Sequence, residues 1–546
     1  MKMRIMLLNA PWYDPDEPSK WGVRGGSRWP HFQKRQGNGE LPRYVPFPFF
    51  MATAAAVIRN NGYETQIIDA VAEDINLDET FKRIDDFKPD LIFAESSTPS
   101  LTWDLKIFAE IKTRLPQVYL VSGGSQGVSM IPEIMEEKGL PDFWLGGEFD
   151  HSLLKLIKAL ESGGELKSVP GLICKGINNP PAVVENVQEL PSPLYSDLPV
   201  HNYSDPVCGL PAPVAQIWLS RGCPYKCTFC VWPQVVFGNN KYRTRDLNAA
   251  LDDIEYLIHE RGCESFYFDD DTTNVGPNRM IELAEGIKAR GLDKYPWSMM
   301  ARADCMNDKA LEALKDAGLY SIKYGVESIS EALVDSCEKG TNLKKFKRAI
   351  EYTKELGIKL HLTFMFGIPE ETEETIDETL AFAMEIAPES AQFSLCTPFP
   401  GTKFYRQCEE NGWLTTSDWS HFLGSDEAVV STPWLCAERL QFKYEEAQQI
   451  WHEFNLTRLR EKQENLLINL QDIVKCGKEW TLLGERDFAD FIWQNKNELL
   501  KNFKDGASPS EEITPVIVSK HNEEKIYRRL KRSQNNLAEK CIRLFN

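Results

Sequence analysis

Three cysteines lie close together near the middle of this 546-residue chain, at Cys223, Cys227 and Cys230. They follow the apolar run Ile217–Gly222, which predicts a strand that leads into a loop. Thiolates this close can each bind one iron of a four-iron cubane and leave the fourth iron open for chemistry. A structural zinc ion would need a fourth ligand with its own spacing, and a redox Cys-x-x-Cys pair would leave Cys223 unexplained. The spacing therefore indicates an iron–sulfur cluster.

Strands and helices alternate around this loop, over residues 214–430. Strand-like runs are expected at Glu264–Phe268, Trp297–Ala301, Ser321–Gly325, Lys359–Phe366 and Ala391–Leu395. Helical patterns fall between them at Ala249–Arg261, Asn278–Arg290, Asp308–Ala317, Lys344–Leu356 and Thr372–Ile386. With the strand before the cysteines, they predict six strand–helix units. Such units form an incomplete parallel (β/α)6 barrel of the TIM type, with its chemistry at the carboxyl ends of the strands.

The cysteine loop resembles the Cys-x-x-x-Cys-x-x-Cys signature of the radical SAM superfamily, and the resemblance continues along the predicted barrel. It implies that the open iron binds S-adenosylmethionine (SAM). It also implies SAM contacts after successive strands, from Asp269, Asp270 and Asp271, then Arg302, Glu327 and Gly367. The superfamily often has Gly-Gly-Glu where this chain has the three aspartates. Carboxylates can hold the SAM ammonium by charge-assisted hydrogen bonds, and which aspartate does so stays open. Singly, each of these positions is more typical of an exposed carboxylate or an ordinary turn, whereas together, in order at successive strand ends, they indicate a SAM site.

Residues 1–160 also alternate strand and helix. Apolar runs at Arg4–Asn9, Thr65–Asp69, Leu91–Ser96, Val118–Ser122 and Phe143–Leu145 predict a doubly wound, Rossmann-like parallel sheet. Such sheets bind ligands at the carboxyl ends of their strands. Small and polar residues occupy those ends here: Ser96, Ser97, Thr98, Gly123, Gly124, Gly146, Gly147 and Glu148. The same residues also suit tight strand–helix turns. No Gly-x-Gly-x-x-Gly follows the first strand, which argues against a dinucleotide site.

This first segment resembles the cobalamin-binding domain that precedes many radical SAM domains. The resemblance implies that the strand-end residues just named bind cobalamin. One loop departs from the pattern. Methionine synthase has Asp-x-His-x-x-Gly after its second strand, whereas this chain has Asp69–Asp74 without a histidine, and its His31 and His151 lie outside that loop. We therefore expect cobalamin to bind with its own base displaced and with no histidine beneath the cobalt.

Two stretches interrupt the predicted domains. The insertion Trp12–Pro46 contains Trp21–Trp29, which is rich in Gly, Arg and Trp. It suits a loop over a cofactor or substrate, and equally a surface loop packed on its own tryptophans. The linker 161–213 holds many prolines. It predicts an extended crossing between domains, with a short hairpin at Gly171–Glu185.

Residues 431–546 predict a helical C-terminal domain. Long helical patterns cover Leu440–Asn469 and Glu485–Asn502 without any cofactor motif. The last stretch, Lys525–Lys540, has the pattern of a basic helix. Such a helix can contact anionic lipid at a membrane surface or a partner, or it can simply lie in solvent.

Composition limits the possible classes. The net charge of −19 argues against nucleic-acid binding, because phosphate contacts need a basic footprint. The most apolar window, Phe47–Ile58, is shorter than the ~18 residues of a membrane-spanning helix, and the first residues lack a signal-peptide pattern. The 13 cysteines then indicate reduced thiols in a cytoplasmic protein rather than a disulfide framework.

Together, the two resemblances imply a cobalamin-dependent radical SAM enzyme with a [4Fe–4S] cluster, SAM and cobalamin as cofactors. Such an enzyme cleaves SAM reductively to a 5′-deoxyadenosyl radical and modifies an unactivated carbon, with methylation as the leading expectation. Two alternatives stay open: a radical cyclase acting on a lipid or tetrapyrrole, and a non-catalytic corrinoid or iron–sulfur sensor. The expected partners are a small-molecule or lipid substrate and an electron donor such as flavodoxin or ferredoxin.

Overall fold

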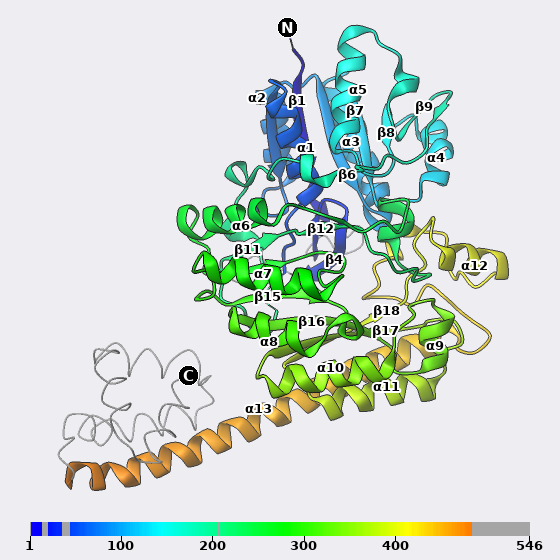
Figure 1. The fold of residues 1–546 in the computed structure, drawn as a ribbon. Coiled ribbons are helices and arrows are strands. Elements are labelled where there is room, and N and C mark those ends of the chain that lie inside the picture. Colours follow the sequence, from blue (N-terminus) through cyan, green and yellow to red (C-terminus); the bar gives the residue numbers. More distant parts are fainter. Residues whose placement is uncertain (1, 14–19, 35–43, 206, 483–546) are drawn as a thin grey trace. The chain divides into compact units, whose positions relative to one another are not determined.

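The computed structural model describes residues 2–13, 20–34, 44–205 and 207–482. By its internal contacts the chain divides into two compact units, Met1–Ala447 and Gln448–Asn546. The first unit contains both α/β segments that the sequence predicts, and Figure 1 shows them as the blue-to-cyan and the green-to-yellow parts of the ribbon.

The first sheet is doubly wound, as predicted. Over the described residues it has seven strands in the order β10-β9-β8-β7-β6-β1-β5. The strands are β1 (Arg4–Asn9), β5 (Glu64–Asp69), β6 (Leu91–Ser96), β7 (Tyr119–Gly124), β8 (Phe143–Leu145), β9 (Leu172–Cys174) and β10 (Ile177–Asn178). Strands β5, β1, β6, β7 and β8 run parallel, and β9 and β10 add an antiparallel edge. The chain order reverses between β1 and β6, which is where such sheets bind ligands.

Helices cover this sheet on both faces. They are α1 (Phe49–Asn60), α2 (Leu77–Phe87), α3 (Leu101–Arg114), α4 (Ile131–Lys138) and α5 (Asp150–Ser162). Ile84 of α2 and Phe108 of α3 pack with Leu8 and Ile92 of the sheet in one buried cluster, whereas α1 and α5 pack together. Because both faces are covered, a central strand such as β6 is buried along its whole length.

The second sheet is the predicted incomplete barrel. In the part of the chain that the structure describes, its six parallel strands follow the order β11-β14-β15-β16-β17-β18. They are β11 (Val214–Ile217), β14 (Ser265–Phe268), β15 (Trp297–Ala301), β16 (Leu319–Glu327), β17 (Lys359–Phe366) and β18 (Ser390–Leu395). The helices are α6 (Leu247–Glu255), α7 (Pro277–Ala289), α8 (Asp308–Asp316), α9 (Glu331–Ser336), α10 (Leu343–Glu355), α11 (Glu373–Ile386) and α12 (Lys403–Asn411).

The insertion after β1 forms a small antiparallel sheet. Its strands are β2 (Trp12–Tyr13), β3 (Lys20–Gly25) and β4 (Arg28–Lys34), so β3 and β4 make a hairpin with Gly26 and Ser27 at its tip. Trp21, Arg24 and Arg28 are at most 5% exposed, which excludes a loop on the surface. Figure 1 shows β4 between the first sheet and the barrel.

The linker contributes to both domains. Strands β9 and β10 form the predicted hairpin and extend the first sheet. Further along, Ser204 pairs with Val45, and the carbonyl oxygen of Val207 accepts a hydrogen bond from Ser321 of the barrel. A second short pair, β12 (Ser220–Arg221) with β13 (Arg243–Thr244), flanks the cysteine loop.

The C-terminal segment begins with α13 (Ala437–Leu482), a longer helix than the predicted Leu440–Asn469. The predicted helices at Glu485–Asn502 and Lys525–Lys540 lie outside the described residues. None of the helices that the structure describes is both long and apolar enough to cross a membrane.

Candidate functional site

The cysteine loop is held in shape by hydrogen bonds to its backbone. The side-chain amide of Gln234, in a π-helical turn just after the loop, donates to the carbonyl oxygens of Cys227, Thr228 and Cys230, each at 3.0 Å. The N–H of Thr228 donates to the carbonyl oxygen of Cys337 at 2.9 Å. The protein itself therefore fixes the loop, which prepares the thiols for a ligand. Sequence reasoning missed Gln234, because a lone glutamine carries no spacing signal.

The three thiols suit an iron–sulfur cluster. Burial raises the pKa of each, to about 11 for Cys227, and the charges of Cys227 and Cys223 raise the pKa of Cys230 further. The thiols are thus close enough to influence one another, and iron binding must displace their protons. Among the described residues, no three His, Cys, Asp or Glu side chains converge on one metal ion. A cubane does not require such convergence, because each cysteine binds a different iron.

Asp270 is committed to the protein. Its carboxylate accepts hydrogen bonds from the N–H groups of Leu219 and Ser220 and, at 2.5 Å, from the Ser220 hydroxyl. Burial raises its pKa to about 7. Asp270 therefore fixes the strand end that leads into the cysteine loop, and little of its hydrogen-bonding capacity remains for a ligand.

Asp269 and Asp271 both lie close to a cation of the protein itself, Arg28. The Asp269 carboxylate lies 3.5 Å from the guanidinium of Arg28. Asp271 accepts a hydrogen bond from the N–H of Gly222, and burial raises its pKa to about 6 while Arg28 lowers it. The next residue, Thr272, has its hydroxyl 3.3 Å from the sulfur of Cys223. Residues Asp269–Asp271, called the acid segment below, therefore adjoin the cysteine loop, as the barrel topology predicts.

Arg302 directly follows β15, and Glu327 is the last residue of β16. Both lie near the cysteine loop. Arg302 stacks 3.6 Å from the ring centroid of Tyr225 and pairs with Asp304 at 2.9 Å. Glu327 pairs with Lys339 at 2.6 Å and has a φ of 63° at a bulge in β16. A left-handed backbone at a non-glycine residue is strained, and such strain collects at functional sites.

Gly367 begins the turn after β17. Its φ is 92°, and a Cβ there would lie 2.7 Å from Leu440. The N–H groups of Gly367 and Ile368 both donate to Oε2 of Glu371, whose Oε1 has no hydrogen-bond partner among the described residues. Burial raises the pKa of Glu371 to about 8. Glu371, which sequence reasoning missed, therefore positions this turn.

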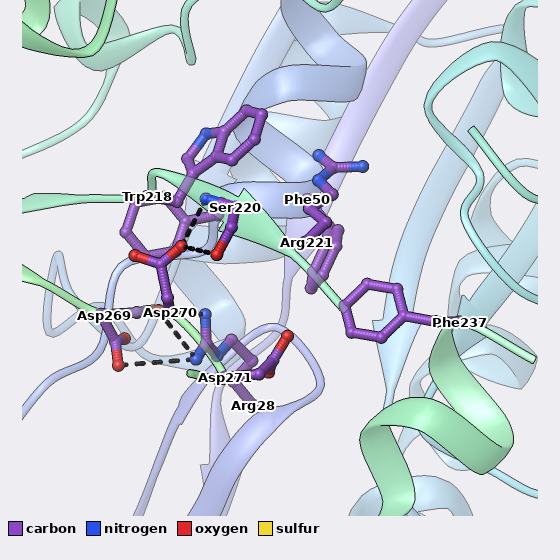
Figure 2. A pocket seen from close by; sticks show the side chains of 10 residues that line it. Arg28, Phe50, Trp218, Ser220, Arg221, Phe237, Asp269, Asp270 and Asp271 are labelled. Carbon is purple, nitrogen blue, oxygen red and sulfur yellow. Dashed lines mark hydrogen bonds and ion pairs between the residues drawn. The ribbon is translucent and has the colours of Figure 1, made fainter. Parts of the chain in front are cut away.

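A small cavity lies where the acid segment meets residues of the first domain. Figure 2 shows Arg28, Asp269 and Asp271 on one side and Trp218, Phe50 and Phe237 on the other. Its empty volume is about 260 Å³. Residues of the first domain and of the barrel line this cavity together.

The strand-end glycines of the first domain are required by close backbone contacts. A Cβ on Gly124, whose φ is 131°, would lie 2.2 Å from the carbonyl oxygen of Ser96. One on Gly123 would lie 2.7 Å from the carbonyl oxygen of Leu145, and one on Gly147 would lie 2.3 Å from that of Ala182. A Cβ on Gly146 would meet only the Val128 side chain, at 3.2 Å. Close backbone contacts alone therefore explain why glycine is needed at three of these four positions.

At the ends of β6 and β7, three buried polar atoms lack partners among the described residues: Oε1 of Glu95, the hydroxyl of Thr98 and Oε1 of Gln126. Each side chain is at most 1% exposed, and an unpaired polar group at such a depth is costly. Glu95 lies at the end of β6 and Thr98 just after it, and Gln126 lies just after the neighbouring strand β7. The hydroxyls of Ser96 and Ser97, in contrast, are hydrogen-bonded to Ser122 and Ser100. A corrin ring carries several amide groups on its rim, so this edge fits cobalamin. Of the three residues, sequence reasoning predicted Thr98 alone.

Glu148 connects the two domains instead of facing open space. Its carboxylate pairs with Arg221 at 3.3 Å and with Arg243, and it accepts the N–H of Val184 at 2.9 Å. Arg221 lies two residues before the first cluster cysteine and also pairs with Asp150. The end of β8 is therefore fastened to the start of the cysteine loop.

The loop after β5 is closed by the linker. The Asp69 carboxylate accepts hydrogen bonds from the amide of Asn9 at 2.8 Å, from the N–H of Ala72 and from the Tyr203 hydroxyl at 2.8 Å. Burial raises the pKa of Asp69 to about 6. These hydrogen bonds hold the loop after β5 against β1 and the linker.

The barrel interior carries polar groups. Lys323, His361 and Ser390 occupy adjacent register positions on β16, β17 and β18, and so share one face of the sheet. Lys323 pairs with Asp205 at 3.3 Å, and His361 Nδ1 lies 2.8 Å from the Ser390 hydroxyl. Burial lowers the pKa of His361 well below its usual value, so the ring is neutral. Its Nε2 has no hydrogen-bond partner within the described part of the chain.

Comparison with protein families identifies two domains in the same order. A family described as "B12 binding domain" matches residues 43–157, and the "Radical SAM superfamily" matches residues 218–383. The first match covers β5 to β8 of the first sheet, and the second runs from just after β11 of the barrel into α11.

Two curated relatives resemble the chain over most of its length. An uncharacterized methyltransferase of Pyrococcus horikoshii is 31% identical, over 70% of this chain and 83% of the relative. An anaerobic magnesium-protoporphyrin IX monomethyl ester cyclase of Cereibacter sphaeroides is 28% identical, over 70% of this chain and 63% of the relative. Among solved structures, the cobalamin-dependent SAM radical enzyme OxsB, with aqua-cobalamin and SAM bound, superposes with a TM-score of 0.61 at 17% identity, covering 100% of this chain and 80% of that one.

Proposed function

The chain belongs to the cobalamin-dependent radical SAM enzymes, and on this premise we propose that it transfers a methyl group to an unactivated carbon of its substrate. The contact between Cys223 and Thr272 supports the SAM site of this proposal, because it joins the cluster loop to the acid segment Asp269–Asp271. The name of the Pyrococcus relative favours methyl transfer over other radical chemistry.

The residues have separate tasks in this proposal. Cys223, Cys227 and Cys230 hold the [4Fe–4S] cluster, and Gln234 keeps their loop in shape. Asp269 and Asp271 receive the SAM ammonium, Arg302 its carboxylate, and Glu327 and Gly367 its remaining polar groups. When bound, the cluster and cobalamin supply the reducing electron and the methyl carrier.

The edge of the first sheet holds cobalamin in this proposal. Thr98 hydrogen-bonds to an amide group, together with Glu95 and Gln126, and the backbone near Ser96, Ser97, Gly123 and Gly124 forms the surface on which the ring lies. Glu148, Gly146 and Gly147 shape the same edge from β8, with Glu148 acting through Arg221. Hydroxyl, amide and neutral carboxyl groups suit the uncharged amides of a corrin.

Radical cyclisation is the second candidate, because the Cereibacter relative is named as a cyclase. Product analysis distinguishes the two. A methylase consumes a second SAM for each product and releases S-adenosylhomocysteine, whereas a cyclase releases 5′-deoxyadenosine without it. We expect both SAM products in stoichiometric amounts from reconstituted enzyme with its substrate.

The first test needs no substrate. Reconstituted protein, reduced with dithionite, should cleave SAM to 5′-deoxyadenosine, and the Cys223→Ala/Cys227→Ala/Cys230→Ala triple variant should not. Absence of cleavage by the wild-type chain would favour a sensor that binds both cofactors without catalysis.

The barrel interior supports a small polar substrate rather than a lipid. Nε2 of the neutral His361 is free to form a hydrogen bond there, and a hydrocarbon skeleton would leave this buried atom unpaired. We further propose that a flavodoxin or ferredoxin supplies the electron, and that the enzyme acts in the cytoplasm, where thiols stay reduced.

A further inference from the structure

The tip of the β3–β4 hairpin rests on the cobalamin edge of the first sheet. The N–H of Ser27 donates to Oε2 of Glu95 at 3.1 Å, and the Ser27 carbonyl accepts from the Ser125 hydroxyl at 3.3 Å. Gly26 has a φ of 60°, and a Cβ there would lie 1.4 Å from the same Glu95 oxygen. The tip is therefore shaped around Glu95, whose other oxygen has no partner among the described residues.

The next residue of the hairpin reaches the barrel. Both terminal nitrogens of Arg28 donate to the carbonyl oxygen of Asp269 at 3.2 Å, and its guanidinium lies 3.5 Å from the Asp269 carboxylate. The same guanidinium lies 5.0 Å from the ring centroid of Trp232, two residues after Cys230. Arg28 is 5% exposed. Figure 2 shows its side chain directed into the cavity toward Asp269 and Asp271.

Two consecutive residues therefore connect three places: the cobalamin edge through Ser27, and the acid segment and the cluster loop through Arg28. A lysine in place of Arg28 would keep the charge. It would lose the planar fork that donates twice to one carbonyl and stacks on an aromatic ring. The geometry of this contact, and not charge alone, is thus specific to arginine.

We propose that Arg28 is a positioning residue that holds the SAM-facing acid segment in register with the cobalamin edge, so that cobalamin binding and SAM binding are thermodynamically coupled through the hairpin tip. The inference rests on the proposed sites for both ligands. A ligand that fixes the tip from one side fixes part of the other ligand's site, and such coupling is reciprocal.

The test is a set of four SAM dissociation constants. They are measured by equilibrium dialysis on cluster-reconstituted protein, wild type and Arg28→Lys, each with and without bound cobalamin. In the wild type we expect cobalamin to tighten SAM binding by about fivefold or more, the lower end of usual coupling factors. In Arg28→Lys we expect the ratio to fall toward one, while iron content and cobalamin retention stay at wild-type levels.

A matched control comes from the same hairpin. Arg24 is also buried, but it pairs with Asp104 at 2.8 Å inside the first domain, so Arg24→Lys should keep the ratio. A wild-type ratio of one, or an unchanged ratio in Arg28→Lys, would overturn the proposal, and so would an equal loss of coupling in Arg24→Lys. SAM cleavage, assayed separately, tests the proposed function independently of these ratios.

Discussion

The guanidinium of Arg221 donates to both carboxylate oxygens of Asp150, at 2.6 and 3.0 Å, across the boundary between the first domain and the barrel. Both side chains are at most 4% exposed. Glu148 lies 3.3 Å from the same guanidinium, and Phe50 and Trp218 stack against it. This buried pair fixes the first domain to the residue that leads into the cysteine loop.

Breaking the pair should destabilise the chain. Asp150→Asn leaves part of a buried arginine charge uncompensated, and loss of one partner from such a pair costs about 3–5 kcal/mol. We expect a lower midpoint in chemical denaturation of the cofactor-free protein. Glu185→Gln, which breaks the exposed pair with Lys241, should leave the denaturation midpoint almost unchanged, because solvent screens exposed ion pairs. Equal effects of the two substitutions would contradict this role.

The cysteine assignment predicts a sharp division among the thiols. Cys223→Ala, Cys227→Ala or Cys230→Ala should each remove the [4Fe–4S] cluster, measured as iron content and as the electron paramagnetic resonance signal of the reduced protein. Cys263→Ala should leave the cluster intact, because Cys263 is buried beside β14 outside the loop. Full iron content in the triple alanine variant would refute the assignment.

Gln234 should control how long the cluster persists. Gln234→Leu keeps the approximate size of the side chain but removes the donor shared by three carbonyl groups of the loop. Loss of these part-buried hydrogen bonds should loosen the loop, so a chelator should remove iron about tenfold faster. Gln188→Leu, at an exposed position, serves as the control and should lose iron at the wild-type rate.

Glu95 should make stability depend on pH. Burial raises its pKa from 4.5 to about 8, outweighing Arg24 and Arg28, which lower it, while the Asp150 charge adds to the rise. The folded chain then holds a proton that the unfolded chain releases above about pH 4.5. Stability contributed by this group is therefore present at low pH and is lost as pH rises toward 8. Glu95→Gln should flatten the decline in thermal midpoint between about pH 5 and pH 8, and an unchanged slope would contradict this.

The cobalt should have no nitrogen ligand from the protein. Asp69 is already bonded to Asn9, Ala72 and Tyr203, and its loop contains no histidine. The electron paramagnetic resonance spectrum of the Co(II) form should lack superhyperfine splitting from an axial nitrogen. His31→Ala and His151→Ala should leave that spectrum unchanged. Splitting that disappears in either variant would identify a histidine ligand.

The strand ranges and the cysteine loop could be predicted because their signals are local. An apolar strand pattern can be recognised from neighbouring residues alone. The predicted ranges of β6 (Leu91–Ser96) and β17 (Lys359–Phe366) therefore match the structure. The order of the two domains also follows from the order of their motifs along the sequence. The interpretation of Trp21–Trp29 stayed open, because a Gly- and Trp-rich segment has the same composition in a buried hairpin and in a surface loop.

Partners that lie far apart in sequence depend on the tertiary structure alone. The sequence predicts that Glu148, at the end of a strand, binds a ligand. In the structure its carboxylate instead accepts a hydrogen bond from Arg221, 73 residues away. Asp270 belongs to a run of three similar aspartates, and only the approach of Leu219 and Ser220 distinguishes it. The local pattern specifies which residues reach the ends of the strands. Folding decides which of their polar atoms are satisfied by the protein and which, like Oε1 of Glu95, have no partner among the described residues.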